Sequence, residues 1–102
     1  MQPFITAKQA EIVELCRTHH VRRFSIFGSA VRDDFDPERS DVDVRIEFKP
    51  DALENYVRNF HSLHDALVAT FGRKVDIISS KEIQNRYLRK EIEDTQVTLY
   101  AA

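Results

Sequence analysis

The sequence predicts an α/β domain of the α+β kind, with a small mixed β-sheet and helices packed on one of its faces. Residues 41–48 (DVDVRIEF) alternate apolar and polar side chains, which is typical of a strand with one buried face. Residues 53–71 carry apolar side chains at steps of three and four, which indicates a long amphipathic helix. The apolar stripe of such a helix needs a partner, and the apolar face of the strand provides one.

The composition is that of a single globular domain spanning residues 1–102. Hydrophobic residues make up 42% of the chain and charged residues 31%, and the net charge is −2. This balance gives no electrostatic reason to expect direct nucleic-acid binding. No long apolar run predicts a transmembrane helix or a signal peptide. The single cysteine, Cys16, excludes a disulfide within the chain and favours the cytoplasm.

Upstream of the alternating strand, the pattern predicts a helix, a short strand and a turn. Thr6 and Gln9 match a capping box, so a helix is expected from Thr6 to about residue 19. Residues 21–27 form a short strand, which ends at Gly28 because glycine tolerates a tight turn. A turn or short helix over residues 30–32 and a polar loop follow.

The long helix has clear signals at both ends. Asp51 and Glu54 are placed to cap its start, and Gly72 is its natural stop. Residues 74–78 (KVDII) then form a third strand, which carries Asp76.

A last helix and a short terminal strand complete the predicted order. Ser79 and Glu82 can cap this helix. Its inward side chains are expected to be Ile83, Tyr87, Leu88 and Ile92. Residues 96–100 end the chain as a strand or an extended tail.

The polar face of the alternating strand is expected to be uncovered. The long helix should cover the apolar face, and no further segment remains for the face that carries Asp41, Asp43, Arg45 and Glu47. That face should therefore be open to solvent, to a ligand or to another chain. Arg45 is expected to balance the nearby aspartates.

Three aspartates are candidate metal ligands. Asp41 and Asp43 stand side by side on one strand face, and Asp76 joins them if its strand is adjacent and in register. Like charges this close favour a bound cation, and Mg²⁺ prefers carboxylate oxygens together with substrate phosphates. The plainer interpretation of Asp41 and Asp43 is a solvated edge strand, and Asp76 alone could pair with Lys74 or Arg45.

Residues 27–48 (FGSAVRDDFDPERSDVDVRIEF) resemble the signature of DNA polymerase β-like nucleotidyltransferases, in which G-S is followed after about ten residues by D-x-D. The KVDII strand and the C-terminal YLRKEIEDTQVTLY resemble the minimal nucleotidyltransferase (MNT) antitoxins, over roughly residues 21–100. Two features depart from the family pattern. The segment between Ser29 and Asp41 is one residue longer than the common form, and Asp33 stands where a glycine often follows the arginine.

The resemblance implies a role for each matching position. Asp41 and Asp43 correspond to the metal-binding pair and Asp76 to the third catalytic carboxylate, which also binds metal and helps to activate the acceptor hydroxyl. Gly28 and Ser29 correspond to the residues that bind the nucleotide's phosphates.

Arg32 occupies the place of an arginine common in the family's loop, which implies nucleotide binding. The resemblance also implies Mg²⁺ as cofactor, ATP as nucleotide donor and a HEPN-domain ribonuclease toxin as partner. The implied reaction transfers AMP to a tyrosine of that toxin, and the chain would form a hetero-oligomer with the toxin or a homo-oligomer.

Two other functions stay open. The chain could neutralise its toxin by covering it, without catalysis. It could instead modify a small molecule or tRNA, as larger relatives do, although it has no basic stripe for RNA.

Overall fold

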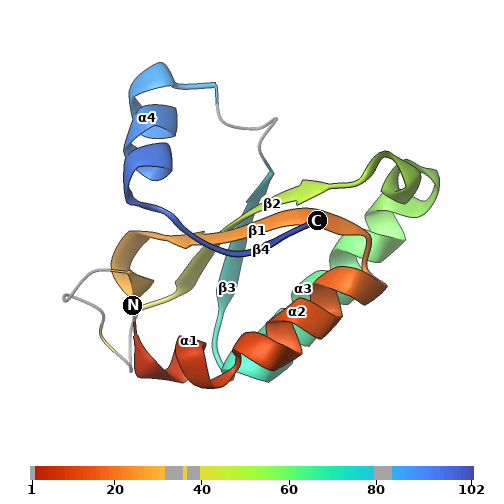
Figure 1. Cartoon of the computed structure of the whole chain (residues 1–102), viewed down its shortest axis with the longest axis horizontal. Coiled ribbons are helices and arrows are strands. Elements are labelled where there is room, and N and C mark those ends of the chain that lie inside the picture. Colours follow the sequence, from red (N-terminus) through yellow and green to blue (C-terminus); the bar gives the residue numbers. More distant parts are fainter. Residues whose placement is uncertain (1, 32–35, 37–39, 80–83) are drawn as a thin grey trace.

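The computed structural model describes residues 2–31, 36, 40–79 and 84–102. In chain order these residues form α1 (Pro3–Ala7), α2 (Gln9–Thr18), β1 (Val21–Phe27), η1 (Gly28–Ala30), β2 (Val42–Phe48), η2 (Pro50–Asn55), α3 (Tyr56–Phe71), β3 (Val75–Ser79), α4 (Arg86–Thr95) and β4 (Val97–Ala101). The four strands make one sheet, in the order β3-β2-β1-β4 (Figure 1). β1 pairs antiparallel with β2 and β4, whereas β2 and β3 are parallel. The mixed sheet with its helices confirms the predicted fold class.

The core lies between one face of the sheet and the helices α2 and α3, which run side by side (Figure 1). The apolar side chains of β2 that alternation predicted to be inward, Val42, Val44 and Ile46, are completely buried. Leu63 and Leu67 of α3 are also completely buried and belong to the same cluster. The long helix therefore covers the predicted face of the sheet.

The N-terminal helical segment is divided into α1 and α2, so the prediction of one continuous helix is wrong. The backbone of Lys8 leaves the helical region with φ −102° and ψ 6°, and no side-chain capping bond starts α2. The separate direction of α1 lets Ile5 enter the core and places Phe4 at 6.1 Å, ring centre to ring centre, from Phe71. The backbone N–H of Gln2 also donates to the carbonyl oxygen of Ala30, which joins the start of the chain to η1.

The long helix begins later than predicted, but it ends at the predicted residue. Residues 50–55 form a 3₁₀ segment, and α3 begins only at Tyr56, without a side-chain cap. Asp51 Oδ2 lies 3.2 Å from His20 Nδ1, and Asp51 makes no capping bond. Gly72 ends the helix in the left-handed conformation, as predicted.

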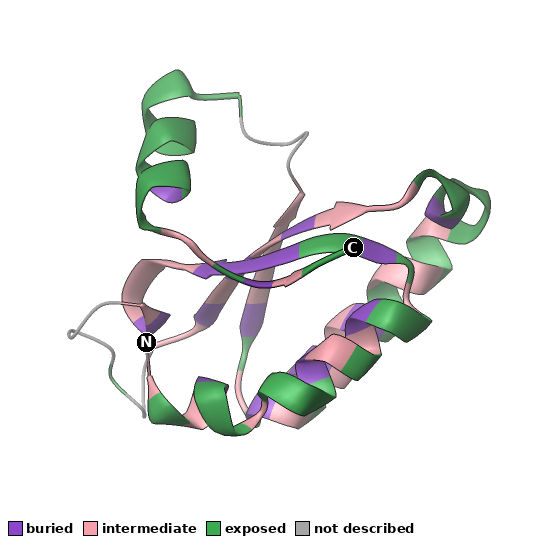
Figure 2. Cartoon of the chain, viewed as in Figure 1, coloured by how far each residue is buried: buried purple, intermediate pink, exposed green. Residues whose placement is uncertain are grey.

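The apolar stripe of the long helix is bare at its N-terminal end. Leu53 and Val57 are 63% and 68% exposed. These residues lie where η2 and the first turn of α3 project beyond the sheet (Figure 2). Periodicity assigned both residues to the apolar stripe, but no element among the described residues covers them.

The last helix, α4, lies on the side of the sheet away from α2 and α3 (Figure 1). The predicted packing of the helices on one face therefore holds for α2 and α3 and is wrong for α4. Asn85 caps it, and Glu82 and Ile83 lie outside the described residues. The expected inward orientation holds for Ile92, which is buried, and is wrong for Tyr87 and Leu88, which are 84% and 45% exposed. No helix in the described ranges is long and apolar enough to cross a membrane.

Candidate active site

The central feature of the site is the pairing of Asp43 with Asp76. The two residues are register partners on the parallel strands β2 and β3, with Val42 opposite Val75 and Val44 opposite Ile77 on either side of them. Their carboxylates therefore leave the same face of the sheet from neighbouring strands, about 5 Å apart at the backbone. Adjacency and register were the two conditions for bringing Asp76 to the site, and both are met.

The turn between β1 and η1 approaches Asp43 closely. Phe27, the last residue of β1, pairs with Asp43, and Gly28 follows with φ +73°. A β-carbon on Gly28 would lie 2.6 Å from Asp43 Oδ2, which is far too close for contact. Only glycine therefore fits here, for its backbone angles and for its lack of a side chain.

Ser29 lies in the one-turn 3₁₀ helix η1, which begins at Gly28, two residues before the predicted turn or short helix over residues 30–32. Val31 N–H donates to the carbonyl oxygen of Gly28 at 3.1 Å and closes the turn, while buried Ala30 anchors it to the core. Ser29 is partly exposed and directly follows Gly28. Arg32, the third predicted nucleotide-binding residue, lies outside the described residues.

Asp41 precedes β2 and is linked to Asp76 through a lysine. Lys74 Nζ lies 3.7 Å from Asp41 Oδ2 and 4.0 Å from Asp76 Oδ1. The backbone holds the two segments together, because Val42 N–H donates to the carbonyl oxygen of Lys74 at 3.1 Å. One positive charge thus lies near two of the three predicted carboxylates, with a side chain that is 71% exposed. The pairing of Asp76 with Lys74 that the sequence left open is therefore real.

The donor chemistry of the site fits Mg²⁺. Asp41, Asp43 and Asp76 offer the carboxylate oxygens that hard divalent cations prefer. Within the described ranges, however, no three acidic, histidine or cysteine side chains are arranged to hold one metal ion. The ammonium group of Lys74 occupies the neighbourhood of Asp41 and Asp76, so binding of a divalent cation would have to displace it.

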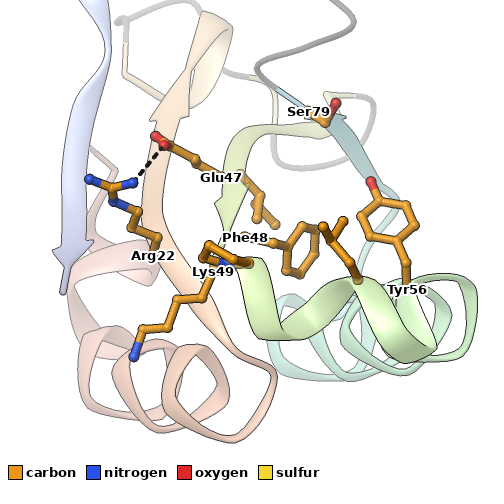
Figure 3. Close-up of a pocket in the computed structure, with 9 residues that line it drawn as sticks. Arg22, Glu47, Phe48, Lys49, Tyr56 and Ser79 are labelled. Atoms are coloured by element: carbon orange, nitrogen blue, oxygen red, sulfur yellow. Dashed lines mark ion pairs between the residues drawn. The ribbon is translucent and has the colours of Figure 1, made fainter.

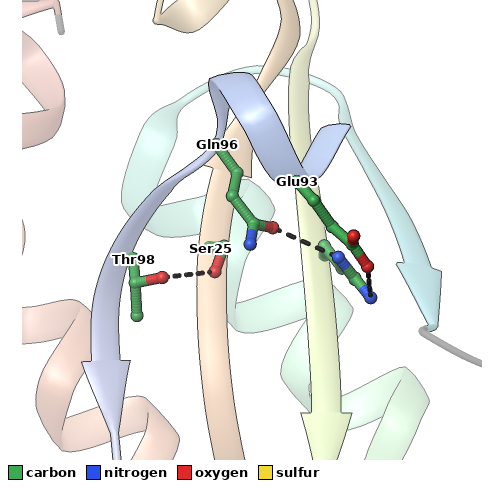
Figure 4. Close-up of polar contacts among 5 residues, drawn as sticks. Ser25, Glu93, Gln96 and Thr98 are labelled. Carbon is green, nitrogen blue, oxygen red and sulfur yellow. Dashed lines mark hydrogen bonds and ion pairs between the residues drawn. The ribbon is translucent and has the colours of Figure 1, made fainter. Parts of the chain in front are cut away.

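Arg45 contacts residues that sequence reasoning missed. It follows Asp43 on the same face of β2, and its Nη2 lies 3.6 Å from Glu93 Oε1 of α4 (Figure 4). Its Nη1 donates to Gln96 Oε1 at 3.4 Å. The expectation that no segment covers this face is thus wrong at Arg45, which is only 15% exposed. No periodic signal could have shown this, because it depends on which side of the sheet α4 lies.

Two hollows among the described residues lie away from the carboxylates. One, of about 340 Å³, lies at the far end of β2 and is lined by Phe48, Tyr56 and Ser79 among others (Figure 3). The other, of about 490 Å³, lies beside the end of α2 and includes His19 and His20. Neither hollow includes Asp41, Asp43 or Asp76.

The fold and the carboxylate pair define a nucleotidyltransferase domain. The family model for that domain matches residues 10–98, so the chain belongs to the nucleotidyltransferase-domain family. This confirms the resemblance of residues 27–48 to nucleotidyltransferases.

Individual relatives agree with this class. A Methanocaldococcus jannaschii protein named as a candidate protein adenylyltransferase is 35% identical over 95 residues, which cover 83% of this chain and 91% of the relative. The solved structure of a candidate minimal nucleotidyltransferase is 26% identical, with a TM-score of 0.76, and the match covers 91% of this chain and 90% of that one.

A more distant structure shares the fold. It is a complex of a tri-AMPylated HEPN toxin from Shewanella oneidensis with an MNT antitoxin. The matching chain is 18% identical, with a TM-score of 0.63, and the match covers 95% of this chain and 72% of that one.

Proposed function

We propose that this chain transfers AMP from ATP to a hydroxyl group of a HEPN-domain ribonuclease toxin in the cytoplasm and thereby neutralises it. The pairing of Asp43 with Asp76, beside Gly28, is the observation that carries the proposal. The candidate protein adenylyltransferase that is 35% identical supports AMP transfer to protein. The fold shared with a chain of an MNT–HEPN complex supports the choice of partner. The proposed acceptor is a tyrosine, whose phenol loses its proton more readily than an aliphatic hydroxyl.

Each site residue has a proposed role. Ser29 donates a hydrogen bond to a phosphate oxygen, and Gly28 lets the backbone approach the phosphates beside Asp43. Asp41, Asp43 and Asp76 would hold Mg²⁺, which neutralises phosphate charge when it is bound. Asp76 accepts the acceptor hydroxyl's proton. The acceptor oxygen forms a bond to the α-phosphorus of ATP, the bond from that phosphorus to the bridging oxygen breaks, and pyrophosphate leaves.

Incubation with ATP labelled at the α-phosphate, Mg²⁺ and the HEPN-domain protein encoded by the same organism tests the proposal. The HEPN-domain protein should become labelled, and replacing its labelled tyrosine by phenylalanine should abolish labelling. The Asp41→Asn/Asp43→Asn variant should label at least about 100-fold more slowly, because a charge-stabilising contact in such a site is worth roughly 3 kcal/mol or more. Equal labelling by this variant would contradict the proposal.

Growth measurements separate catalysis from masking. If the carboxylate variant still protects cells from the toxin as well as the wild type does, then covering the toxin is sufficient. Transfer of AMP would then not be the mechanism of neutralisation.

A further inference from the structure

Helix α4 is folded and capped, yet it is almost completely exposed. Asn85 Oδ1 accepts hydrogen bonds from the backbone N–H groups of Tyr87 and Leu88 at 2.9 and 3.1 Å, which defines the first turn. Residues 84–91 are all exposed (Figure 2). The first two turns of this helix therefore form a stable surface that no described part of the chain covers.

The apolar stripe of α4 is buried at its C-terminal end and exposed to solvent at its N-terminal end. Leu88 and Ile92 are four residues apart, so they lie on one side of the helix, and Tyr87 adjoins them. Ile92 is 2% exposed, whereas Leu88 is 45% and Tyr87 84% exposed. Tyrosine is enriched at the centres of protein contacts, and here it lies next to an exposed leucine that continues a buried stripe.

Positive charge borders the bare end of the stripe. Arg86 and Lys90 are four residues apart, next to Tyr87 on the helix surface, and both are exposed. The acidic residues Glu91, Glu93 and Asp94 lie in the C-terminal half, with Glu91 four residues after Tyr87. The exposed apolar residues Tyr87 and Leu88 thus lie in the basic, N-terminal half of the helix.

The C-terminal end of α4 is held close to the candidate active site. Glu93 lies 3.6 Å from Arg45, and Gln96, directly after the helix, accepts from Arg45 at 3.4 Å (Figure 4). Arg45 and Asp43 are two residues apart on β2, about 7 Å along the strand. A protein bound on α4 would therefore lie on the same side of the sheet as the carboxylates.

We propose that Tyr87, Leu88, Arg86 and Lys90 form the docking surface for the acceptor protein, and that this protein presents an apolar side chain flanked by carboxylates. This inference rests on the proposed transfer of AMP to a protein. A second copy of the chain is the competing occupant, because antiparallel pairing about a two-fold axis would set the basic half of α4 against its acidic half. The mass measurement below distinguishes that arrangement from docking of the acceptor protein. Nucleic acid fits poorly because the same helix carries Glu93 and Asp94 and the chain has a net charge of −2.

The test measures affinity for the HEPN-domain protein of the same organism, in an Asp43→Asn background in which transfer is blocked. Tyr87→Ser/Leu88→Ser should weaken binding at least tenfold. Leu53→Ser/Val57→Ser is the matched control, because these side chains are equally apolar and 63% and 68% exposed elsewhere. This control variant should bind the HEPN-domain protein with the same affinity as the parent protein does. Circular dichroism should show that both variants keep the parent's helicity and melting temperature.

Charge reversal tests the chemistry of the partner. Arg86→Glu/Lys90→Glu should weaken binding and make it less sensitive to salt, whereas Arg58→Glu on α3 should change neither property. Unchanged affinity in the Tyr87/Leu88 variant would overturn the inference. So would a mass measurement in which the chain alone is a dimer and that variant a monomer, since the surface would then join two copies.

The two proposals fail in different ways. If the HEPN-domain protein binds through α4 but never accepts AMP, the docking surface stands and the proposed reaction is wrong. If AMP is transferred and the Tyr87/Leu88 variant transfers and binds normally, the reaction stands and the docking surface is wrong.

Discussion

Gly28 and Asp43 lie so close together that a β-carbon at Gly28 would come within 2.6 Å of Asp43 Oδ2. The turn that ends β1 therefore packs directly against the carboxylate on β2. A side chain added at Gly28 would have to displace Asp43.

Gly28→Ala should remove activity and lower stability, whereas Gly72→Ala should only lower stability. Both glycines have positive φ, +73° and +67°, so both substitutions strain the backbone by about 1–2 kcal/mol. A β-carbon at Gly72 meets nothing within 4 Å, which makes it a matched control. Urea unfolding measures the loss of stability that the two variants share. The rate of AMP transfer should be lost in Gly28→Ala and retained in Gly72→Ala. Equal activity in the two variants would show that the clash with Asp43 has no functional effect.

Lys74→Gln should strengthen binding of divalent cations to the nucleotide-free protein. The ammonium group of Lys74 competes for Asp41 and Asp76, and an exposed pair of this kind is worth up to about 1 kcal/mol, or roughly fivefold in affinity. Titration with Mn²⁺, followed by its paramagnetic resonance signal, measures the change. Lys8→Gln, which disrupts only the surface pair with Glu11, is the control and should leave Mn²⁺ affinity unaltered.

Cys16 should be unreactive in the folded protein. Burial raises the pKa of its thiol to about 12, so at pH 8 the nucleophilic thiolate is nearly absent. In the unfolded chain the thiol ionises near pH 8.5, so the free energy of unfolding should fall as the pH rises from about 8.5 towards 12. Alkylation at pH 8 should be slow without denaturant and fast in guanidinium chloride. Cys16→Ala should lose this part of the alkaline dependence, and rapid labelling of the native protein would refute the prediction.

Ser25 and Thr98 should show strong coupling in a double-mutant cycle. Ser25 is completely buried, and its Oγ lies 3.0 Å from Thr98 Oγ1 across β1 and β4 (Figure 4). Thr98→Val should cost about 1–3 kcal/mol, because it leaves a buried hydroxyl without that partner. Ser25→Ala/Thr98→Val should cost less than the sum of the single changes, as measured by urea unfolding. Strictly additive costs would mean that the hydroxyl pair does not stabilise the sheet.

Local patterns predicted most of the elements because they depend on neighbouring residues. Alternation identified β2 and its buried face, and the helical period identified α3, which ends at Gly72 as expected. The same reasoning failed at Lys8, where the helix is interrupted, because the separate path of α1 buries Ile5 in a core formed by distant segments.

Sequence alone determined which residues are candidates for the site and which side chains share a face. Spacing placed Asp41 and Asp43 together and singled out Gly28, since these relationships follow from the period of a strand and the needs of a turn. The assignment of these residues to one site and their catalytic roles stay predictions.

Only the tertiary structure determined which residues lie next to each other on neighbouring strands and which helix covers each face of the sheet. The parallel pairing of β2 with β3 brings Asp76 to Asp43 over a long separation in sequence, and hydrogen bonds between strands set that register. The position of α4 decided that Ile92 is buried and that Tyr87 and Leu88 are bare. A periodic pattern shows which side chains lie on one stripe, but the element that covers the stripe is chosen by packing between distant parts of the chain.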